Sequence, residues 1–335
     1  MTSPRGEELA TSSVSEVVVG VDLGGTNTSV GIVNEEGQEI SHAMFPTRPK
    51  ESAEEFVGRL AGVIRELVGK LGRGTALRGI GIASPAANGF RGTIESPANL
   101  GWGTVNIIDI IRRHFSVPVV VSNDANAALL GERLFGVARG MKNVIMVTIG
   151  TGLGAGIAVD GKLILGENGA AGEFGHITID PQGRVCGCGR RGCVESYVSA
   201  RGLRRTVHEL LADRLEESPL RAISFNDLTA ETVSRLAGEG DVIAQEALTR
   251  TGGYLGRLVA NLAAAFDPEA VVLYGGLVNA GELLVGPTRQ AFEKSAMKLY
   301  LGKVRILVSS LNNGKAAILG ASSLVRDALA GVEAA

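Results

Sequence analysis

The apolar positions near the start of the chain follow a strand pattern and then change to a helical one. Residues 16–21 form a β-branched run, residues 22–27 contain two adjacent glycines, and residues 28–33 resume the run. This arrangement predicts a hairpin with a glycine-rich tip, and residues 37–45 are expected to add a third strand. Apolar side chains then recur three and four residues apart, which predicts a helix with one face formed by Phe56, Leu60, Val63, Leu67 and Leu71.

The next segment alternates strand and helix patterns. Residues 80–83 are an apolar run, and the following segment, rich in Pro, Asn and Gly, is expected to be a loop over residues 84–103. A strand is expected over residues 118–121, and a helix over residues 125–135 that Asp124 or a neighbour caps. Between them, the spacing predicts a helix lined by Val105, Ile108, Ile111 and Phe115.

The second half of the sequence begins as the first half does. Predicted strands over residues 144–148 and 155–159 flank a second glycine-rich turn at residues 150–154. Helices are expected over residues 200–265, strands over 270–274 and 304–309, and a closing helix over 315–329. Two halves of this kind predict two closely coupled α/β lobes around a cleft. The expected lobes are residues 16–123, closed by the helix 315–330, and residues 124–314.

The composition narrows the function classes. The 335 residues carry 33 basic and 35 acidic side chains, a formal net charge of −2, and 45% are hydrophobic. This balance provides no basic surface that would attract nucleic acid or an acidic membrane, so neither is expected as a partner. The sequence has no apolar run long enough to span a membrane. Residues 1–15 are polar and are expected to be a disordered lead-in, not a signal peptide, which predicts a cytoplasmic protein.

All cysteines of the chain lie together, and a histidine precedes them by ten residues. The three cysteines fall within eight residues, and the glycines between them allow turns that bring the sulfurs together. Three thiolates and one imidazole complete a tetrahedral zinc shell with no position left for water, as in structural sites. The expected ligands are His176, Cys186, Cys188 and Cys193. The alternative is a set of reduced cysteines in a surface loop, and either case indicates a reducing compartment.

Both glycine-rich turns have the composition of phosphate-binding turns. Glycine lets backbone N–H groups approach phosphate oxygens, and a threonine such as Thr26 adds a hydroxyl donor. Asp22 can hold the waters of a Mg²⁺ ion, because Mg²⁺ prefers few carboxylates and several waters. The second turn lacks the lysine of a Walker loop, and a strand follows it where a dinucleotide fingerprint needs a helix. An ordinary hairpin turn explains either segment alone, whereas the pair favours phosphate binding.

Asp124 is the candidate general base. A carboxylate at the carboxyl end of a strand can accept the proton of a substrate hydroxyl as that oxygen attacks phosphorus. Asn123 can orient neighbouring hydroxyls, and the alternative for this pair of residues is a helix cap. Gly275 and Gly276 follow another buried-looking strand and suit a nucleoside base or ribose lying across the backbone. Simple close packing at the strand end is the alternative for these two glycines.

Further candidates surround the cysteine segment. Glu173, His176 and Glu195 flank it, and fixed carboxylates there suit the hydroxyl groups of a polyhydroxylated substrate. A zinc-bound His176 can offer its other ring nitrogen to the substrate. A solvated acid at the start of a helix is the alternative for Glu195. Asn99, in the loop 84–103, is a candidate for facing the cleft.

Together these motifs resemble the ROK family of sugar kinases and repressors, over about residues 17–328. The matching segments are Asp22-Leu-Gly-Gly-Thr, Ser-Pro-Ala-Asn99-Leu-Gly-Trp, Asn123-Asp124-Ala-Asn126, Gly150-Thr-Gly-Leu-Gly-Ala-Gly, Gly172-Glu173-Phe-Gly-His176 and Cys186-Gly-Cys188-Gly-Arg-Arg-Gly-Cys193-Val-Glu195. The resemblance implies an actin-like ATPase (ribonuclease H-like) fold of two lobes that close on substrate. It implies an ATP-dependent kinase that converts glucose to glucose 6-phosphate, with Mg²⁺ accompanying ATP.

The resemblance also implies roles for individual residues. Asp124 is the expected general base, and the zinc ligands are those given above. The sugar contacts are expected from Asn99, Asn123, Asp124, Glu173, His176 and Glu195. The ATP contacts are expected from Asp22, Gly24, Gly25, Thr26, Asn27, Thr151, Gly152, Gly275 and Gly276. Asn27 stands where many members of the family carry lysine.

Other functions remain open from the sequence. A kinase of the same family for N-acetylmannosamine or another hexose is the nearest alternative, and polyphosphate is an alternative phosphoryl donor. A sugar-responsive repressor is more remote, because repressors of the family carry an N-terminal helix-turn-helix domain. The fifteen or so residues before the first predicted strand are too few for such a domain. A homodimer is the expected oligomer.

Overall fold

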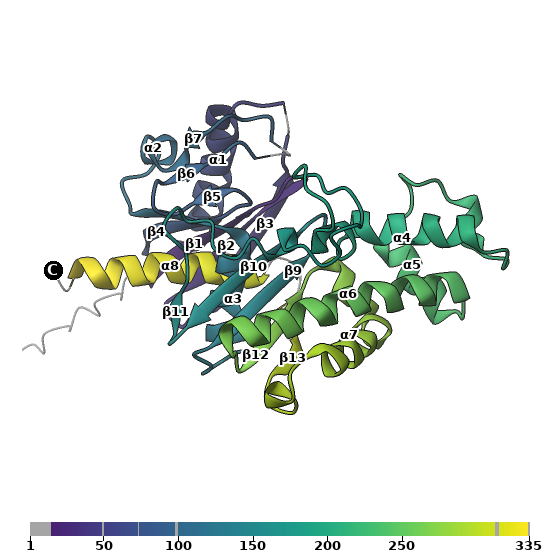
Figure 1. The fold of residues 1–335 in the computed structure, drawn as a ribbon. Helices are drawn as coiled ribbons and strands as arrows, with labels where there is room; N and C mark the ends of the chain where they lie inside the picture. Colours follow the sequence, from purple (N-terminus) through teal and green to yellow (C-terminus); the bar gives the residue numbers. More distant parts are fainter. Residues whose placement is uncertain (1–14, 49, 73, 98–99, 312–314, 334–335) are drawn as a thin grey trace, which may run out of the picture. The chain divides into compact units, whose positions relative to one another are not determined.

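The computed structural model describes residues 15–48, 50–72, 74–97, 100–311 and 315–333 (Figure 1). Contacts within the chain define two compact units, of which unit 1 comprises residues 1–122 and 321–335 and unit 2 comprises residues 123–320. Each unit is built around one five-stranded sheet. The lead-in expected over residues 1–15 lies outside the described residues except for Ser15, which is the first residue of a strand.

The sheet of unit 1 has the strand order β3-β2-β1-β4-β8. Strands β1 to β3 are antiparallel neighbours, whereas β4 and β8 run parallel to β1. The predicted hairpin is confirmed, with Asp22 paired to Ser29 beside the turn. The strands are β1 (Ser15–Leu23), β2 (Asn27–Asn34), β3 (Glu39–Pro46), β4 (Thr75–Ala83) and β8 (Val119–Ser122).

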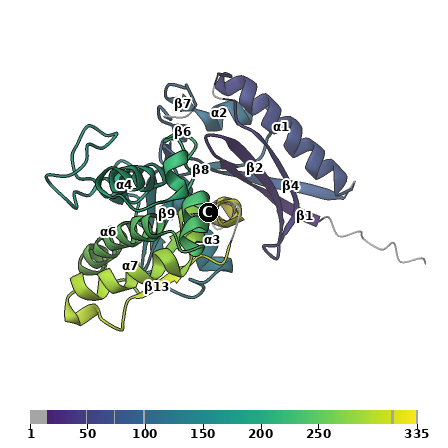
Figure 2. The ribbon, with the colours of Figure 1, turned by 90° about the vertical axis from the view of Figure 1, so that its right-hand side faces the viewer.

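Helix α1 (Ala53–Lys70) runs along this sheet (Figure 2). It begins with a capping box, in which Ser52 accepts the backbone N–H of Glu55 and the Glu55 carboxylate accepts that of Ser52. Its apolar face, including Phe56 and Leu60, is buried in a core that it shares with β1, β4 and α2 (Ile107–Arg112). A small sheet of β5 (Ala87–Asn88), β6 (Thr93–Ile94) and β7 (Val105–Asn106) completes this part of the unit.

The closing helix α8 (Lys315–Glu333) is confirmed, and its residues from Ala321 onward belong to unit 1. It packs closely on β4, because a Cβ atom on Gly81 would lie 1.9 Å from the carbonyl oxygen of Ala321. Only glycine allows the strand and the helix backbone to approach this closely.

The sheet of unit 2 repeats the same plan, with the strand order β11-β10-β9-β12-β13. Strands β9 to β11 are antiparallel neighbours, and β12 and β13 run parallel to β9. This duplicated topology is that of the actin-like ATPase fold, as the resemblance to the ROK family implies. The strands are β9 (Val144–Ile149), β10 (Leu153–Val159), β11 (Lys162–Leu163), β12 (Ala270–Tyr274) and β13 (Arg305–Val308).

Helices cover both faces of this second sheet. Along β9, Ile145 and Val147 pack into the core beneath α4 to α7, whereas Val144 and Met146 pack on the opposite side with α3. This alternation is the two-residue period of a strand buried on both faces. The helices are α3 (Asp124–Phe135), α4 (Ala200–Asp213), α5 (Ala230–Gly238), α6 (Val242–Phe266) and α7 (Glu282–Ser295). Short 3₁₀ helices are η1 (Phe174–His176), η2 (Val194–Ser196), η3 (Pro219–Ala222), η4 (Gly276–Ala280) and η5 (Lys298–Tyr300).

Two local predictions were wrong. The segment 84–103 is not only a loop, because β5 and β6 pair within it. The helix predicted from Val105 to Phe115 is shorter, since Val105 pairs with Ile94 in the small sheet and Asn106 caps α2 by accepting the N–H of Asp109. In the part of the chain that the structure describes, no helix combines the length and apolar character needed to cross a membrane.

Candidate functional site

The side chains of His176, Cys186, Cys188 and Cys193 form one cluster, and their ligand atoms all lie within 4.8 Å of one another. The Cys188 and Cys193 sulfurs are 3.7 Å apart, and the Cys186 sulfur is 3.6 Å from His176 Nδ1. Zinc bonds of about 2.3 Å to sulfur and about 2.0 Å to nitrogen, at tetrahedral angles, require separations of about 3.8 Å and about 3.5 Å. These four residues, here termed the metal cluster, therefore fit one structural zinc ion.

The loop geometry explains why the sulfurs converge. The N–H of Cys186 donates to the carbonyl of Arg190 at 2.8 Å, which closes a tight turn around Cys188. Gly192 has a φ of +71°, and a Cβ atom there would lie 1.6 Å from the carbonyl oxygen of Asp180. Thr178 and Cys193 form an isolated β-bridge that joins the two sides of the loop. Gly192 thus allows an approach to Asp180 that any side chain would block, whereas a Cβ atom on Gly187 or Gly189 would meet nothing within 4 Å.

The thiols of the cluster have unlike proton affinities without a metal. Burial, and then hydrogen bonds and charges from Cys188 and Cys186, raise the pKa of Cys193 to about 12. The backbone N–H of Arg190 has the opposite effect and lowers the pKa of Cys188. A divalent cation is the group that holds several thiolates together at neutral pH, because it stabilises their negative charge.

His176 presents its two ring nitrogens to different neighbours. Nδ1 faces the Cys186 sulfur, whereas Nε2 lies 4.0 Å from a carboxylate oxygen of Glu173. The side chain of Glu173 is 64% exposed. The structure therefore brings Glu173 and His176 together, with an open carboxylate next to the metal cluster.

Asn123 and Asp124 lie at the start of α3. Asn123, not Asp124, is the cap, and its Oδ1 accepts the N–H of Ala125 at 2.9 Å. Asp124 is the first helical residue, and one of its carboxylate oxygens accepts the same N–H at 2.8 Å. Burial raises the pKa of Asp124, and the charge of Glu173 raises it further, although the backbone hydrogen bonds oppose both. A raised pKa suits a group that takes up a proton during a reaction.

Glu195 contacts the second glycine-rich turn directly. Its Oε2 accepts the N–H of Leu153, the first residue of β10, at 3.0 Å. The turn itself is closed by a hydrogen bond from the N–H of Gly150 to the carbonyl of Gly152 at 3.0 Å. Thr151, at the tip, is exposed. The structure therefore places Glu195 beside Gly152, a contact that the sequence pattern does not indicate.

A cavity of about 360 Å³ lies beside this turn within unit 2. Gly275 and Gly276 differ in their relation to it. Gly275 has a φ of +108°, and its Cβ atom would lie 2.4 Å from the carbonyl oxygen of Ile149, so this glycine serves close packing. A Cβ atom on Gly276 would meet nothing within 4 Å, and Gly276 lines the cavity. The other lining residues are Gly150, Ala200, Ala230, Glu231, Ser234, Leu277 and Asn279.

The first glycine-rich turn belongs to unit 1 and is braced by a residue that sequence reasoning missed. The buried Thr47, just after β3, donates its hydroxyl to the carbonyl of Gly24 and its N–H to the carbonyl of Thr26, both at 2.8 Å. Thr26 and Asn27 are exposed, whereas Asp22 and Gly25 are half-buried. No local pattern marks Thr47, because its contact depends on the pairing of β2 with β3.

Asn99, expected as a sugar contact, lies outside the described residues. The α5 and η4 residues Glu231, Ser234 and Asn279 were also missed as cavity-lining residues. Their helical positions carry no motif that would mark them, since each is an ordinary polar residue on an amphipathic segment.

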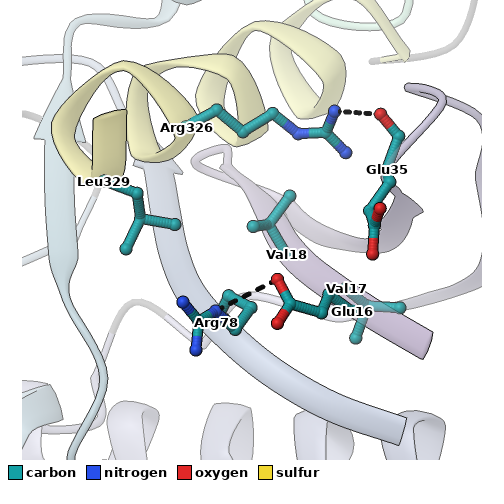
Figure 3. Close-up of a pocket in the computed structure, with 7 residues that line it drawn as sticks. All are labelled: Glu16, Val17, Val18, Glu35, Arg78, Arg326 and Leu329. Carbon is teal, nitrogen blue, oxygen red and sulfur yellow. Dashed lines mark hydrogen bonds and ion pairs between the residues drawn. The ribbon is translucent and has the colours of Figure 1, made fainter. Parts of the chain in front are cut away.

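A second cavity, of about 230 Å³, lies in unit 1 (Figure 3). Its wall includes an ion pair between Arg78 and Glu16 at 3.2 Å, and Arg326 of α8 donates to the backbone carbonyl of Glu35 at 2.6 Å. Burial lowers the pKa of Arg326, and the carboxylates of Glu35 and Glu36 oppose this effect. None of the candidate site residues lines this cavity. Its ion pair joins β4 to β1, whereas the contact of Arg326 attaches α8 to Glu35, just after β2.

Comparison with known proteins identifies relatives along nearly the whole chain. A family model described as "ROK family" matches residues 18–328. A glucokinase of Thermotoga maritima is 34% identical over 94% of this chain and 98% of its own length. A xylose repressor of Caldicellulosiruptor bescii is 31% identical over 92% of this chain and 77% of its own length. A crystal structure of a ROK family glucokinase from Streptomyces griseus, in complex with glucose and AMPPNP, superposes with a TM-score of 0.79 at 33% identity, covering 93% of this chain and 99% of that one.

Proposed function

The chain belongs to the ROK family, and from this premise we propose that it phosphorylates glucose with ATP to give glucose 6-phosphate. The geometric observation that carries the proposal is the position of Asp124, whose pKa is raised by burial at the first turn of α3. It lies in the same unit as a glycine-rich turn that borders a cavity of about 360 Å³. The near full-length similarity to glucokinases supports glucose as the acceptor.

The reaction needs a base, a bound sugar and a held triphosphate. The Asp124 carboxylate accepts the proton of the sugar 6-hydroxyl as that oxygen attacks the γ-phosphorus of ATP, and the bond from this phosphorus to the ADP oxygen breaks. ADP leaves, and Asp124 later releases its proton to solvent. Most of the catalysis is positioning and charge stabilisation, so the residues that hold the two substrates matter as much as the base.

We assign the remaining candidates to these tasks. Asn99, Asn123, Glu173, His176 and Glu195 are proposed to contact the sugar. On the nucleotide side, Thr151 and Gly152 are proposed to contact phosphates and Gly276 the nucleoside, with Gly275 shaping the strand end. From unit 1, we propose that Gly24, Gly25, Thr26 and Asn27 contact phosphates and that Asp22 holds waters of the Mg²⁺ ion that accompanies ATP.

The metal cluster is proposed to be structural. A zinc ion on His176 and the three cysteines would supply rigidity, because its four positions are filled by protein ligands and none is left for a substrate. Its chemistry agrees with a reducing compartment, and we propose a cytoplasmic location and a homodimer. Light scattering on the purified protein tests the dimer.

The test of the proposed activity is ADP release measured with Mg-ATP and a panel of hexoses that includes glucose, mannose, fructose and N-acetylmannosamine. We expect glucose to give the highest kcat/KM, and Asp124→Ala to lower kcat at least about a hundredfold. Zinc content and thermal unfolding of the variant serve as controls. Near-normal turnover by a folded, zinc-loaded Asp124→Ala protein would show that Asp124 is not the base. A preference for another hexose, or for polyphosphate over ATP, would redirect the substrate assignment within the same reaction.

A further inference from the structure

Glu195 follows the zinc ligand Cys193 by two residues, yet its carboxylate lies against the glycine-rich turn of the β9–β10 hairpin. Its Oε2 accepts the N–H of Leu153 at 3.0 Å. A Cβ atom on Gly152 would lie 2.6 Å from the same oxygen. The carboxylate is therefore in contact with both the last turn residue and the first residue of the following strand.

The segment that carries Glu195 also holds the other end of the turn. The N–H of Ala200 donates to the carbonyl of Gly150 at 2.9 Å. Ser199 connects the two contacts, because its hydroxyl donates to the carbonyl of Glu195 at 2.8 Å and accepts the N–H of Gly202 at 2.9 Å. Residues 195–200 thus contact the turn at its beginning and at its end.

A second segment, which carries the candidate metal ligand His176, meets the same strand residue. Gly175 precedes the ligand His176, and a Cβ atom on Gly175 would lie 2.5 Å from the carbonyl oxygen of Leu153 and 3.4 Å from Cβ of Glu195. Leu153 is buried where these two segments converge. A metal ion that joins His176 to Cys193 would therefore fix both segments against the start of β10.

We propose that Glu195 is a positioning residue for the nucleotide, through which the metal cluster holds the phosphate-binding turn in its binding conformation. This inference rests on the proposed function, and it adds a nucleotide-side role to the sugar contact expected of Glu195. A turn that is held at both ends before binding loses less conformational entropy when it binds phosphate, and its affinity for phosphate is higher for that reason. The carboxylate acts by accepting the Leu153 N–H, since its negative charge by itself would repel phosphate.

The experiment is a calorimetric titration of the zinc-loaded, full-length protein with Mg-AMPPNP in the absence of any sugar. Glu195→Ala is expected to weaken binding about tenfold, the effect of losing one charge-assisted hydrogen bond that orders a binding turn. Glu195→Gln keeps an acceptor oxygen for Leu153 and removes the charge, so its affinity should stay within about threefold of the unmodified protein. Glu173→Ala is the matched comparison, because Glu173 is exposed and lies next to His176. It should weaken glucose binding and leave the Mg-AMPPNP titration unchanged.

Hydrogen exchange supplies a readout that a sugar contact would not change. The amide of Leu153 should exchange faster in Glu195→Ala than in Glu195→Gln, and faster after chelation of the metal. If Glu195→Ala fails to fold, Glu195→Asp retracts the carboxylate by one methylene and should weaken Mg-AMPPNP binding at least about threefold. Unchanged nucleotide affinity and unchanged Leu153 exchange in a folded variant that has lost glucose affinity would overturn the inference. Failure of the unmodified protein to bind Mg-AMPPNP would instead refute the proposed function.

Discussion

Gly275 and Gly276 are neighbours in sequence, but the structure predicts opposite consequences for replacing them. Gly275 has a φ of +108°, and its Cβ atom would lie 2.4 Å from the carbonyl oxygen of Ile149 and 2.8 Å from the carbonyl carbon. A non-glycine residue in this backbone region costs about 1–3 kcal/mol. Overpacking of a close contact adds about 1–3 kcal/mol. Gly275→Ala should therefore lower the free energy of unfolding by at least about 2 kcal/mol.

Gly276 is predicted to tolerate a side chain and to lose ligand instead. Its Cβ atom would meet nothing within 4 Å, and the residue lines the cavity of about 360 Å³ that we assign to the nucleotide. Gly276→Val should change the stability by less than about 1 kcal/mol, as at other positions without close contacts. It should raise the Kd for Mg-AMPPNP roughly five- to hundredfold, because the branched side chain occupies space that the nucleoside needs.

The two variants are compared by guanidinium unfolding without nucleotide, which would itself stabilise the folded state, and by titration with Mg-AMPPNP. Each variant is the control for the other. A Gly275→Ala protein as stable as the unmodified chain would refute the close approach of β12 to β9 at this point. A Gly276→Val protein with unchanged nucleotide affinity would show that the cavity is not the nucleotide site.

Four other predictions rest on three separate observations. The pKa of Asp124 is raised, and the proposed reaction uses its ionised form as the base. We therefore expect kcat/KM to fall with decreasing pH along a limb above about 3.9, the ordinary value for Asp. A limb at or below that value would contradict the role of burial. The raised pKa of Asp124 also means that its ionised carboxylate destabilises the folded state. At pH 7, Asp124→Asn should therefore unfold at a higher denaturant concentration than the unmodified protein, and this stability difference should disappear below about pH 4. The N–H groups of Asn143 and Lys142 lower the pKa of Glu269. Glu269→Gln should therefore be less stable than the unmodified protein at neutral pH, and the difference should vanish as acid protonates the Glu269 carboxyl. A stability difference that persists in acid would exclude the charge as its cause. In α6, a Cβ atom on Gly256 would lie 2.3 Å from the carbonyl oxygen of Thr288 in α7, whereas one on Gly253 would meet nothing within 4 Å. In urea unfolding, Gly256→Ala should destabilise the protein by about 1–3 kcal/mol, and Gly253→Ala should stabilise it by up to about 1 kcal/mol. Equal unfolding midpoints of the two variants would refute the packing argument.

The strands, the long helices and the metal cluster were predictable because their signals are local. The hairpin over residues 16–33 shows its period and its turn in one stretch of sequence, and α1 adds a capping box to its apolar spacing. The four metal-ligating candidates lie within eighteen residues, so their convergence needs only tight glycine turns. In each case the residues that decide the structure are close together in the chain.

The errors arise where a distant partner decides the outcome. Val105 fits a helical spacing, but its pairing with Ile94 extends the small sheet and delays α2 until the Asn106 cap. By contrast, the prediction that Asp124 or a neighbour caps α3 is confirmed, and the cap is Asn123. The contact from Glu195 to Leu153 spans 42 positions, and no spacing in the sequence carries that information.

The two glycine-rich turns occupy equivalent places in the two sheets, but different groups hold them in position. Both follow the first strand of their sheet and precede an antiparallel partner. In unit 1 the brace is Thr47, a buried hydroxyl at the end of the adjoining strand, whose position depends only on the pairing of β2 with β3. In unit 2 the strand that corresponds to β3 is the short β11. The long loop after β11 carries the metal cluster, and its residue Glu195 contacts the turn. The first turn is therefore set by the sheet itself. The second is set by a loop whose flanks pack on the core through Phe174 and Val194, but whose cysteine-bearing tip, residues 181–191, is mostly exposed. A metal ion bound by His176 and the three cysteines would hold this tip, whose glycines lose more conformational entropy on folding than other residues do.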